Sequence, residues 1–145
     1  SFENYDDFHE RAVKDLHDAL MKASQNGKYP IVIDHSACFN HAFKHMPDLE
    51  INDISEFLCK YVVPHLDIEK CDERVIVHKQ CKIKSLNKSQ YIEDLARLCT
   101  DHVFNIKSFA CDGFAGQKGF FTPELNKSAT KDLAGEIAEY GATLG

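Results

Sequence analysis

The 145-residue sequence has no apolar run approaching the roughly 18 residues that a membrane-spanning helix needs, and no secretory signal peptide is visible at its N-terminus. It also lacks an excess of basic residues, with 17 Lys and Arg against 23 Asp and Glu and a formal net charge of −6. A nucleic-acid-binding face needs clustered Lys and Arg, so this charge argues against a nucleic-acid partner. We therefore expect no transmembrane segment and a cytoplasmic protein.

The sequence also lacks any linker, internal repeat or low-complexity segment, which predicts a single domain over residues 1–145 with a leading helix in 1–28. Hydrophobic periodicity and capping signals predict helices over 4–24, 53–64, 87–99 and 122–140, and strands over 29–33, 74–77 and 103–109. Residues 44–51 and 66–72 are expected to be irregular. Because helices separate successive strands, we expect a three-layer α/β fold, with a mainly parallel sheet of three or more strands and helices on both faces.

Three of the six cysteines closely follow the three predicted strands, namely Cys38, Cys81 and Cys111. In a parallel sheet these positions share the carboxyl edge, where binding sites concentrate. Strand ends are also often buried, so a set of core thiols is the alternative to a metal site. Thiolates select zinc, copper(I) or iron–sulfur clusters, and the absence of a CxxC spacing weakens zinc. The sequence therefore leaves a thiolate metal site and buried core cysteines both open.

A fourth ligand for such a site has three candidates near the cysteines, which are His78, His35 and Asp112. A cysteine nucleophile with His78 or His35 as its base is a further alternative, but no local signature supports it. Six cysteines without a secretory signal indicate a reducing compartment, where thiols are more often ligands or core residues than disulfides.

The other cysteines and several histidines have less specific interpretations. Cys59 and Cys99 are expected on helices and Cys71 in a loop, and all three are predicted to be small buried side chains. His41 and His45 are four apart, a spacing that could bind a metal on a helix, but no third ligand is indicated and a solvated face is favoured. Three further histidines are predicted at the surface: His9, His17 and His65.

A glycine-rich loop over 109–124 joins the third predicted strand to the last helix. Its glycines at 113, 116 and 119 spell GxxGxxG, which is neither a P-loop nor a Rossmann fingerprint, so nucleotide binding is not indicated. We predict instead that they let the backbone fold closely around Cys111 before Thr122 and Pro123 begin the helix.

Three ordered blocks of this sequence resemble the cysteine-rich CCG domain. The blocks are DxSxC at 34–38, HxxC at 78–81 and CDGFAGxxGFxxPEL at 111–125, and the resemblance runs from about residue 29 to the end of the chain. That domain occurs in heterodisulfide reductases and in the iron–sulfur subunits of anaerobic glycerol-3-phosphate dehydrogenase and glycolate oxidase. It also forms the C-terminal end of fused FAD-linked D-lactate dehydrogenases, which the third block resembles most closely.

The resemblance implies that Cys38, Cys81 and Cys111 are ligands of an iron–sulfur cluster of the 4Fe-4S kind, with Gly113 and Gly116 in the cofactor-binding loop. The cluster would accept electrons from a flavin that oxidises a D-2-hydroxyacid, usually D-lactate. FAD would lie in a domain before residue 1, so the fragment alone would have no dehydrogenase activity. The implied acceptor is a quinone or a cytochrome, which would place the protein at the inner face of a membrane as a peripheral protein.

Two departures from the family pattern concern the ligands. Asp112 stands where the motif has a second cysteine, and the chain stops at Gly145, where relatives continue into a segment with a further cysteine. A carboxylate binds a soft cluster less well than a thiolate, so a labile or empty cluster is expected in protein prepared in air. Asp112 and His78 are the candidates for the fourth ligand. A cluster-less structural or docking module and a zinc-binding domain are the alternative functions.

Overall fold

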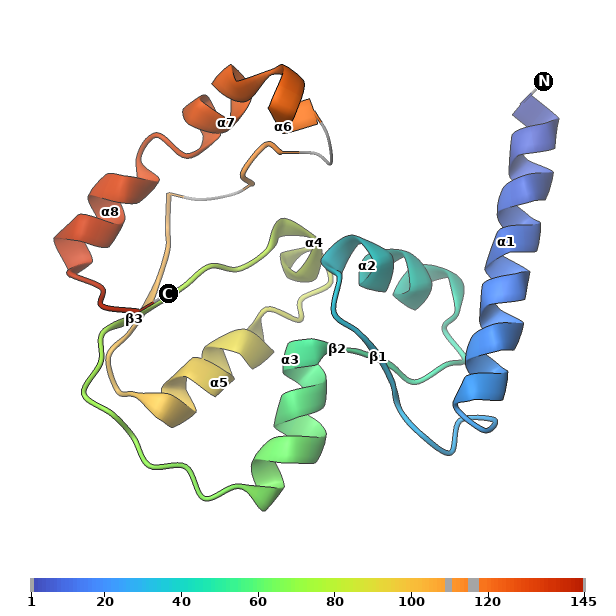
Figure 1. Ribbon diagram of the computed structural model, residues 1–145, viewed down its shortest axis with the longest axis horizontal. Helices are drawn as coiled ribbons and strands as arrows, with labels where there is room; N and C mark the ends of the chain where they lie inside the picture. Colours follow the sequence, from blue (N-terminus) through green and yellow to red (C-terminus); the bar gives the residue numbers. More distant parts are fainter. Residues whose placement is uncertain (1, 109–110, 115–117, 145) are drawn as a thin grey trace. The chain divides into compact units, whose positions relative to one another are not determined.

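The computed structural model describes residues 2–108, 111–114 and 118–144 (Figure 1). The chain divides into two compact units, Ser1–Phe57 and Leu58–Gly145. Each unit combines helices with one pair of parallel strands, so the α/β class is as predicted. No helix within the described part of the chain is long and apolar enough to cross a membrane. The prediction of one domain over residues 1–145 stays a prediction.

Unit 1 contains a β-α-β arrangement that follows a long N-terminal helix. Its elements are α1 (Phe2–Ala23), β1 (Ile31–Ile33), α2 (Ser36–His45), β2 (Ile51–Asp53) and α3 (Ile54–Phe57). β1 and β2 pair in parallel, with Ile31 opposite Ile51. The predicted leading helix and first strand are therefore confirmed in α1 and β1.

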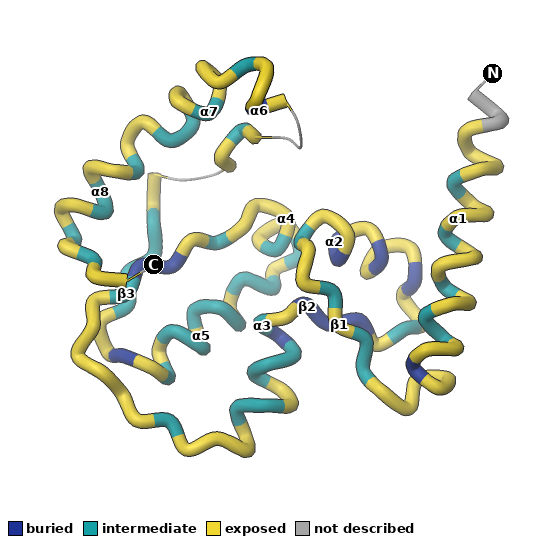
Figure 2. The backbone as a smooth tube through the Cα atoms, viewed as in Figure 1, coloured by how far each residue is buried: buried dark blue, intermediate teal, exposed yellow. Residues whose placement is uncertain are grey.

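The core of unit 1 lies between α2 and β2 (Figure 2). Phe39, Ala42 and Met46 are at most 1% exposed, and their spacing places them on one face of α2. Ile51 of β2 is buried with them. Burial of this face fixes the rotation of α2 about its axis. Asn40 is buried as well, and most of the other positions of α2 are exposed.

The sequence did not predict α2 or β2, since it placed Cys38 shortly after the first strand without assigning a helix there and expected irregular structure over 44–51. All three residues of β2 are buried although two of them, Asn52 and Asp53, are polar. The buried carboxylate of Asp53 is stabilised because its Oδ1 accepts hydrogen bonds from the backbone N–H groups of Ser55 at 2.7 Å and Glu56 at 3.1 Å. These bonds cap the start of α3, where the sequence predicts a helix to begin.

The predicted helix over 53–64 is α-helical only in α3. The chain continues as a π-helical turn, Leu58–Val62, and a 3₁₀ turn, Val63–His65, in which Pro64 is an early residue. A proline cannot donate the backbone hydrogen bond of a helix interior, which is consistent with the tightening of the helix at this point.

Unit 2 holds the second parallel strand pair and the C-terminal helices. Its elements are β3 (Val75–Val77), α4 (Cys81–Lys84), α5 (Gln90–Cys99), β4 (Val103–Asn105), α6 (Lys118–Phe121), α7 (Pro123–Ala129) and α8 (Leu133–Tyr140). β3 pairs in parallel with β4, and Val75 also forms an isolated parallel bridge with Leu144. The described residues therefore show two two-stranded sheets, and they do not show the predicted sheet of three or more strands in three layers.

The last predicted helix, over 122–140, is broken into α7 and α8. Its two ends are as expected, with Pro123 in the first position of α7 and Gly141 closing α8 in the left-handed region at φ 67°. α7 ends at Thr130, whose backbone N–H and hydroxyl both donate to the carbonyl of Asn126, at 2.9 and 2.8 Å. The chain then turns, with the N–H of Leu133 donating to the carbonyl of Thr130 at 3.1 Å where α8 begins. Apolar spacing alone predicted one continuous helix and could not show this local closure.

Candidate functional site

Unit 2 brings two of the three predicted cysteine ligands together. Cys81 is the first residue of α4, shortly after β3, and Cys111 follows β4. The Cys111 thiol lies near enough to affect the pKa of the Cys81 thiol, and both residues are exposed. Two soft donors from distant parts of the sequence thus meet beyond the carboxyl ends of two paired parallel strands, where binding sites concentrate.

The surroundings of Cys81 change the acidity of its thiol. Desolvation, followed by the hydrogen bond with Cys111, raises the pKa of the Cys81 thiol above its ordinary value. A cysteine nucleophile needs the opposite change, because the thiolate is the reactive form. The arrangement therefore favours metal ligation, in which a bound cation displaces the protons, over nucleophilic catalysis by Cys81.

The loop at Cys111 is held by short-range hydrogen bonds. The sulfur of Cys111 accepts from the N–H of Gly113 at 3.4 Å, and Oδ1 of Asp112 accepts from the N–H of Phe114 at 2.9 Å. The same Asp112 oxygen lies 3.9 Å from the Cys111 sulfur. The carboxylate and the thiol are therefore close neighbours, although one carboxylate oxygen already has a backbone donor.

The loop also packs against α7 through its glycines. Gly113 has a φ of 70°, and a Cβ there would lie 3.5 Å from the carbonyl oxygen of Leu125. A Cβ on Gly119 would lie 2.5 Å from the Phe114 ring and 2.6 Å from Oδ1 of Asn126, so a side chain would displace its neighbours. Gly116 lies outside the described residues, and the assignment of Gly113 to a cofactor stays a prediction.

The side chain of Asn126 fixes the backbone beside Cys111 from the other direction. Its Nδ2 donates to the carbonyl oxygen of Asp112 at 2.7 Å. The Cys111–Gly113 turn is therefore tied to α7 by a side chain as well as by the close approach of its glycine.

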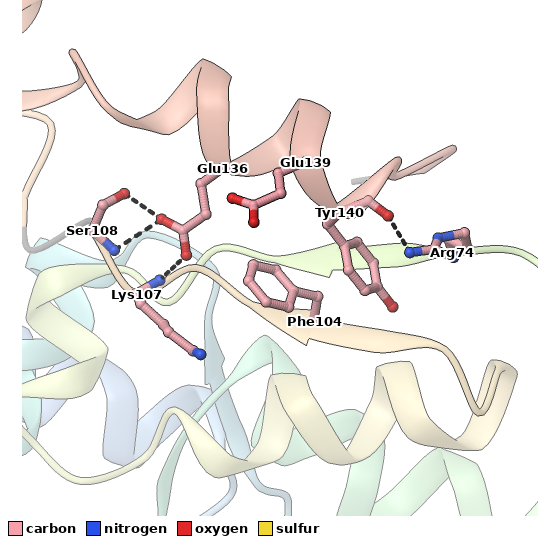
Figure 3. A pocket seen from close by; sticks show the side chains of 7 residues that line it. All are labelled: Arg74, Phe104, Lys107, Ser108, Glu136, Glu139 and Tyr140. Carbon is pink, nitrogen blue, oxygen red and sulfur yellow. Dashed lines mark hydrogen bonds between the residues drawn. The ribbon is translucent and has the colours of Figure 1, made fainter.

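A carboxylate on α8 holds the segment that leaves β4 toward Cys111 (Figure 3). Glu136 accepts hydrogen bonds from the backbone N–H of Lys107 at 2.6 Å and of Ser108 at 3.0 Å, and also from the Ser108 hydroxyl. These donors lower the pKa of the Glu136 carboxyl, the Ser108 hydroxyl most strongly. The segment is thus bound to α8 just before the part of the chain that carries the thiol.

Glu136 and its partners line an open hollow of about 670 Å³ at α8 and β4 (Figure 3). The Tyr140 ring stacks on Phe104 with centroids 4.6 Å apart, and the Arg74 guanidinium lies over the Tyr140 ring and donates to its carbonyl oxygen. The polar groups of the hollow are largely engaged with one another, and its described lining includes no cysteine. Its residues connect the strands to α8 and support the loop.

The remaining predicted ligands have different positions. Cys38 lies exposed in the first turn of α2, in unit 1, where its N–H donates to Nδ1 of His35 at 3.4 Å. His78 is exposed and directly follows β3. The convergence of Cys38 and His78 with the Cys81–Cys111 pair stays a prediction.

The prediction that the other three cysteines are buried is wrong for two of them. Cys71 and Cys99 are exposed, while Cys59 is half-buried. The thiol of Cys71 donates to the carbonyl oxygen of Cys99 at 3.3 Å, and Cys59 donates to that of Tyr91 at 3.5 Å. Backbone carbonyl oxygens of α5 thus accept hydrogen bonds from these two thiols, and the thiols need no apolar core around them.

Sequence reasoning missed a cluster of three histidines in unit 1. His41 and His45 lie on α2 as their spacing suggests, and the third ring is that of His9 on α1. One ring nitrogen from each residue lies within 4.8 Å of the others. The spacing of four was the available signal for the α2 pair, whereas no spacing could indicate His9, because it comes from another helix.

Comparison of the chain with protein-family models, with curated proteins and with solved structures finds no match to any of them.

Proposed function

We propose that this chain is an iron–sulfur electron-transfer domain in which Cys81 and Cys111 are cluster ligands. The observation that carries the proposal is the proximity of these two thiols, which follow β3 and β4 in the chain. Both cysteines belong to the sequence blocks that resemble the CCG domain, and each follows a strand of the same parallel pair.

The donors fit a soft metal centre. Thiolates are the usual ligands of iron–sulfur clusters, and both thiols are exposed, so iron and sulfide can reach them. A complete ligand set needs more than two groups. Following the resemblance, we assign Cys38 as the third ligand and Asp112 or His78 as the fourth.

A bound cluster would supply one-electron acceptance and donation. The chain's own contribution is to hold and tune its ligands. The N–H of Gly113 already points at the Cys111 sulfur at 3.4 Å, and a hydrogen bond to a ligand sulfur raises the reduction potential by stabilising added negative charge. Asn126 fixes the turn and Glu136 fixes the segment before it, so both act as positioning residues.

The parent protein proposed here is an FAD-linked dehydrogenase of D-2-hydroxyacids, D-lactate foremost. Its flavin domain would pass electrons to the cluster, and a quinone or cytochrome would receive them, with the protein in the cytoplasm or peripheral at the inner membrane face. The predicted three-layer architecture with one parallel sheet of three or more strands is part of the same proposal. The parallel pairing of β1–β2 and of β3–β4 is compatible with it.

The test is anaerobic reconstitution with iron and sulfide, on this chain and on the full-length protein that contains it. We expect a brown species with broad visible absorption. Cys81→Ser and Cys111→Ser should each lose most of the bound iron. Cys71→Ser is the matched control, because Cys71 is also an exposed thiol but donates to the Cys99 carbonyl, and it should bind iron as the unaltered chain does.

Three outcomes would contradict the proposal. They are no iron uptake by the full-length protein, iron retention by both serine variants, and stoichiometric zinc in freshly purified protein that accepts no iron. A fourth variant addresses Asp112. If its carboxylate occupies a ligand position, Asp112→Cys should slow the loss of iron in air, because a thiolate binds the cluster more tightly.

A further inference from the structure

Three imidazole rings of unit 1 face one another across α1 and α2. The ring centroid of His9 is 5.3 Å from that of His41 and 5.1 Å from that of His45, and the two α2 rings are 4.5 Å apart. The His9 ring stands nearly perpendicular to the His41 ring, at 85°. Their edges and nitrogens therefore converge on a common point.

Both helices contribute to the position of this cluster. His41 and His45 are one turn apart and so lie on the same face of α2, while Phe39, Ala42 and Met46 bury its other face. α1 is tied to the chain after α2 at a second point, where Nε2 of His17 lies 2.8 Å from Oδ2 of Asp48. The approach of the two helices thus does not depend on the three rings alone.

The rings have no other polar role within the described residues. None of the three forms a hydrogen bond or ion pair with another side chain there, whereas the rings of His17 and His102 each contact an aspartate. An imidazole nitrogen with a free lone pair is the form in which histidine binds metals.

We propose that His9, His41 and His45 bind one divalent late-transition-metal ion, zinc foremost. Zinc–nitrogen bonds of about 2.0–2.1 Å place tetrahedral ligand nitrogens roughly 3.3 Å apart. The nitrogens lie within 4.8 Å of one another, so small side-chain rotations complete the site. His41 and His45 are exposed, which gives the ion access and leaves a fourth position for water.

Imidazole donors suit zinc, copper(II) and nickel(II), whereas an iron–sulfur cluster needs thiolates. The histidine site is therefore chemically distinct from the Cys81–Cys111 pair and does not rest on the function proposed for it. Bound to one ligand on α1 and two on α2, the ion would join the two helices.

The test is calorimetric titration of zinc chloride into the full chain carrying Cys38→Ser, Cys81→Ser and Cys111→Ser, so that these thiols do not compete. We expect one site per chain. His9→Ala, His41→Ala and His45→Ala should each weaken zinc binding at least about tenfold, since changes to groups that only orient metal ligands already cost 10–100-fold. His65→Ala, at an exposed histidine of unit 2, is the matched control and should bind as the background protein does.

A second measurement needs no histidine substitution. In ¹⁵N NMR spectra of the imidazole side chains, zinc should shift the signals of His9, His41 and His45 and leave that of His65 in place. Zinc affinity equal to background in the His9→Ala variant, or unshifted signals of the three rings at saturating zinc, would overturn the proposal.

Discussion

Glu93 of α5 is paired with two cationic side chains, and its removal should have a measurable, pH-dependent cost. Its Oε2 accepts from Nζ of Lys79 at 2.6 Å and its Oε1 from the Arg97 guanidinium at 2.8 and 3.1 Å. Lys79, then Arg97, lower the pKa of the carboxyl from 4.5 to about 2. We therefore expect Glu93→Gln to destabilise the fold at neutral pH.

The magnitude follows from that difference in pKa. A fall from 4.5 to about 2 corresponds to roughly 3 kcal/mol at 1.36 kcal/mol per pH unit. The Glu93 side chain is 13% exposed, but that of Lys79 is 27% and that of Arg97 is 51% exposed, so water and salt screen both pairs. After this reduction we expect a loss of about 1–2 kcal/mol in the free energy of unfolding.

The pH dependence has a definite sign. The pKa of Glu93 is lower in the folded chain than in the unfolded one, so its stabilisation is complete above about pH 4.5 and is lost as the pH falls toward 2. Urea unfolding between about pH 7 and pH 2.5 should therefore show the difference between the wild type and Glu93→Gln shrinking only below pH 4.5. Glu69→Gln, at an exposed glutamate of the loop before β3, is the control and should change stability little. A difference that stays constant through this range would refute the electrostatic explanation.

Three further predictions concern packing and capping, and urea unfolding checks each of them. Gly119→Ala should destabilise the chain by about 1–3 kcal/mol because its Cβ would overlap the Phe114 ring, whereas Gly135→Ala, with no atom within 4 Å, should stabilise α8 by about 0.4–1 kcal/mol. Equal effects of these two substitutions would contradict the prediction. Asp53→Ala should cost about 1 kcal/mol through loss of the α3 cap, and Asp53→Asn should recover most of it. Phe39→Ala should cost about 3–5 kcal/mol, and a loss below about 1 kcal/mol would show that this ring is not in a packed core.

The sequence predicted those elements whose apolar spacing or β-branched runs are regular. α1, β1, β3 and α5 lie close to their predicted ranges. α2 was missed although Phe39, Ala42 and Met46 have helical spacing, because no helix was assigned between the first strand and residue 53. β2 could not be found from its pattern, since a three-residue strand with two buried polar residues departs from every strand signal.

The candidate sites were likewise only partly predictable from the sequence. The proximity of Cys81 and Cys111 was predictable, because parallel strands bring their carboxyl ends to one edge. For the histidine cluster, the spacing of His41 and His45 indicated two of the three residues. His9 could not be added, because its approach depends on how α1 packs against α2.

The isolated bridge between Val75 and Leu144 has a consequence for how the protein can be handled. The carbonyl oxygen of Leu144 accepts from the N–H of Ile76 at 3.0 Å, and the N–H of Thr143 donates to the carbonyl oxygen of Arg74 at 2.9 Å. The last described residues thereby cover the edge of β3 that β4 does not pair with. Trimming the chain before Thr143 would expose that edge as a template for another molecule, so slow hydrogen exchange at the Ile76 amide would report that the edge is still closed.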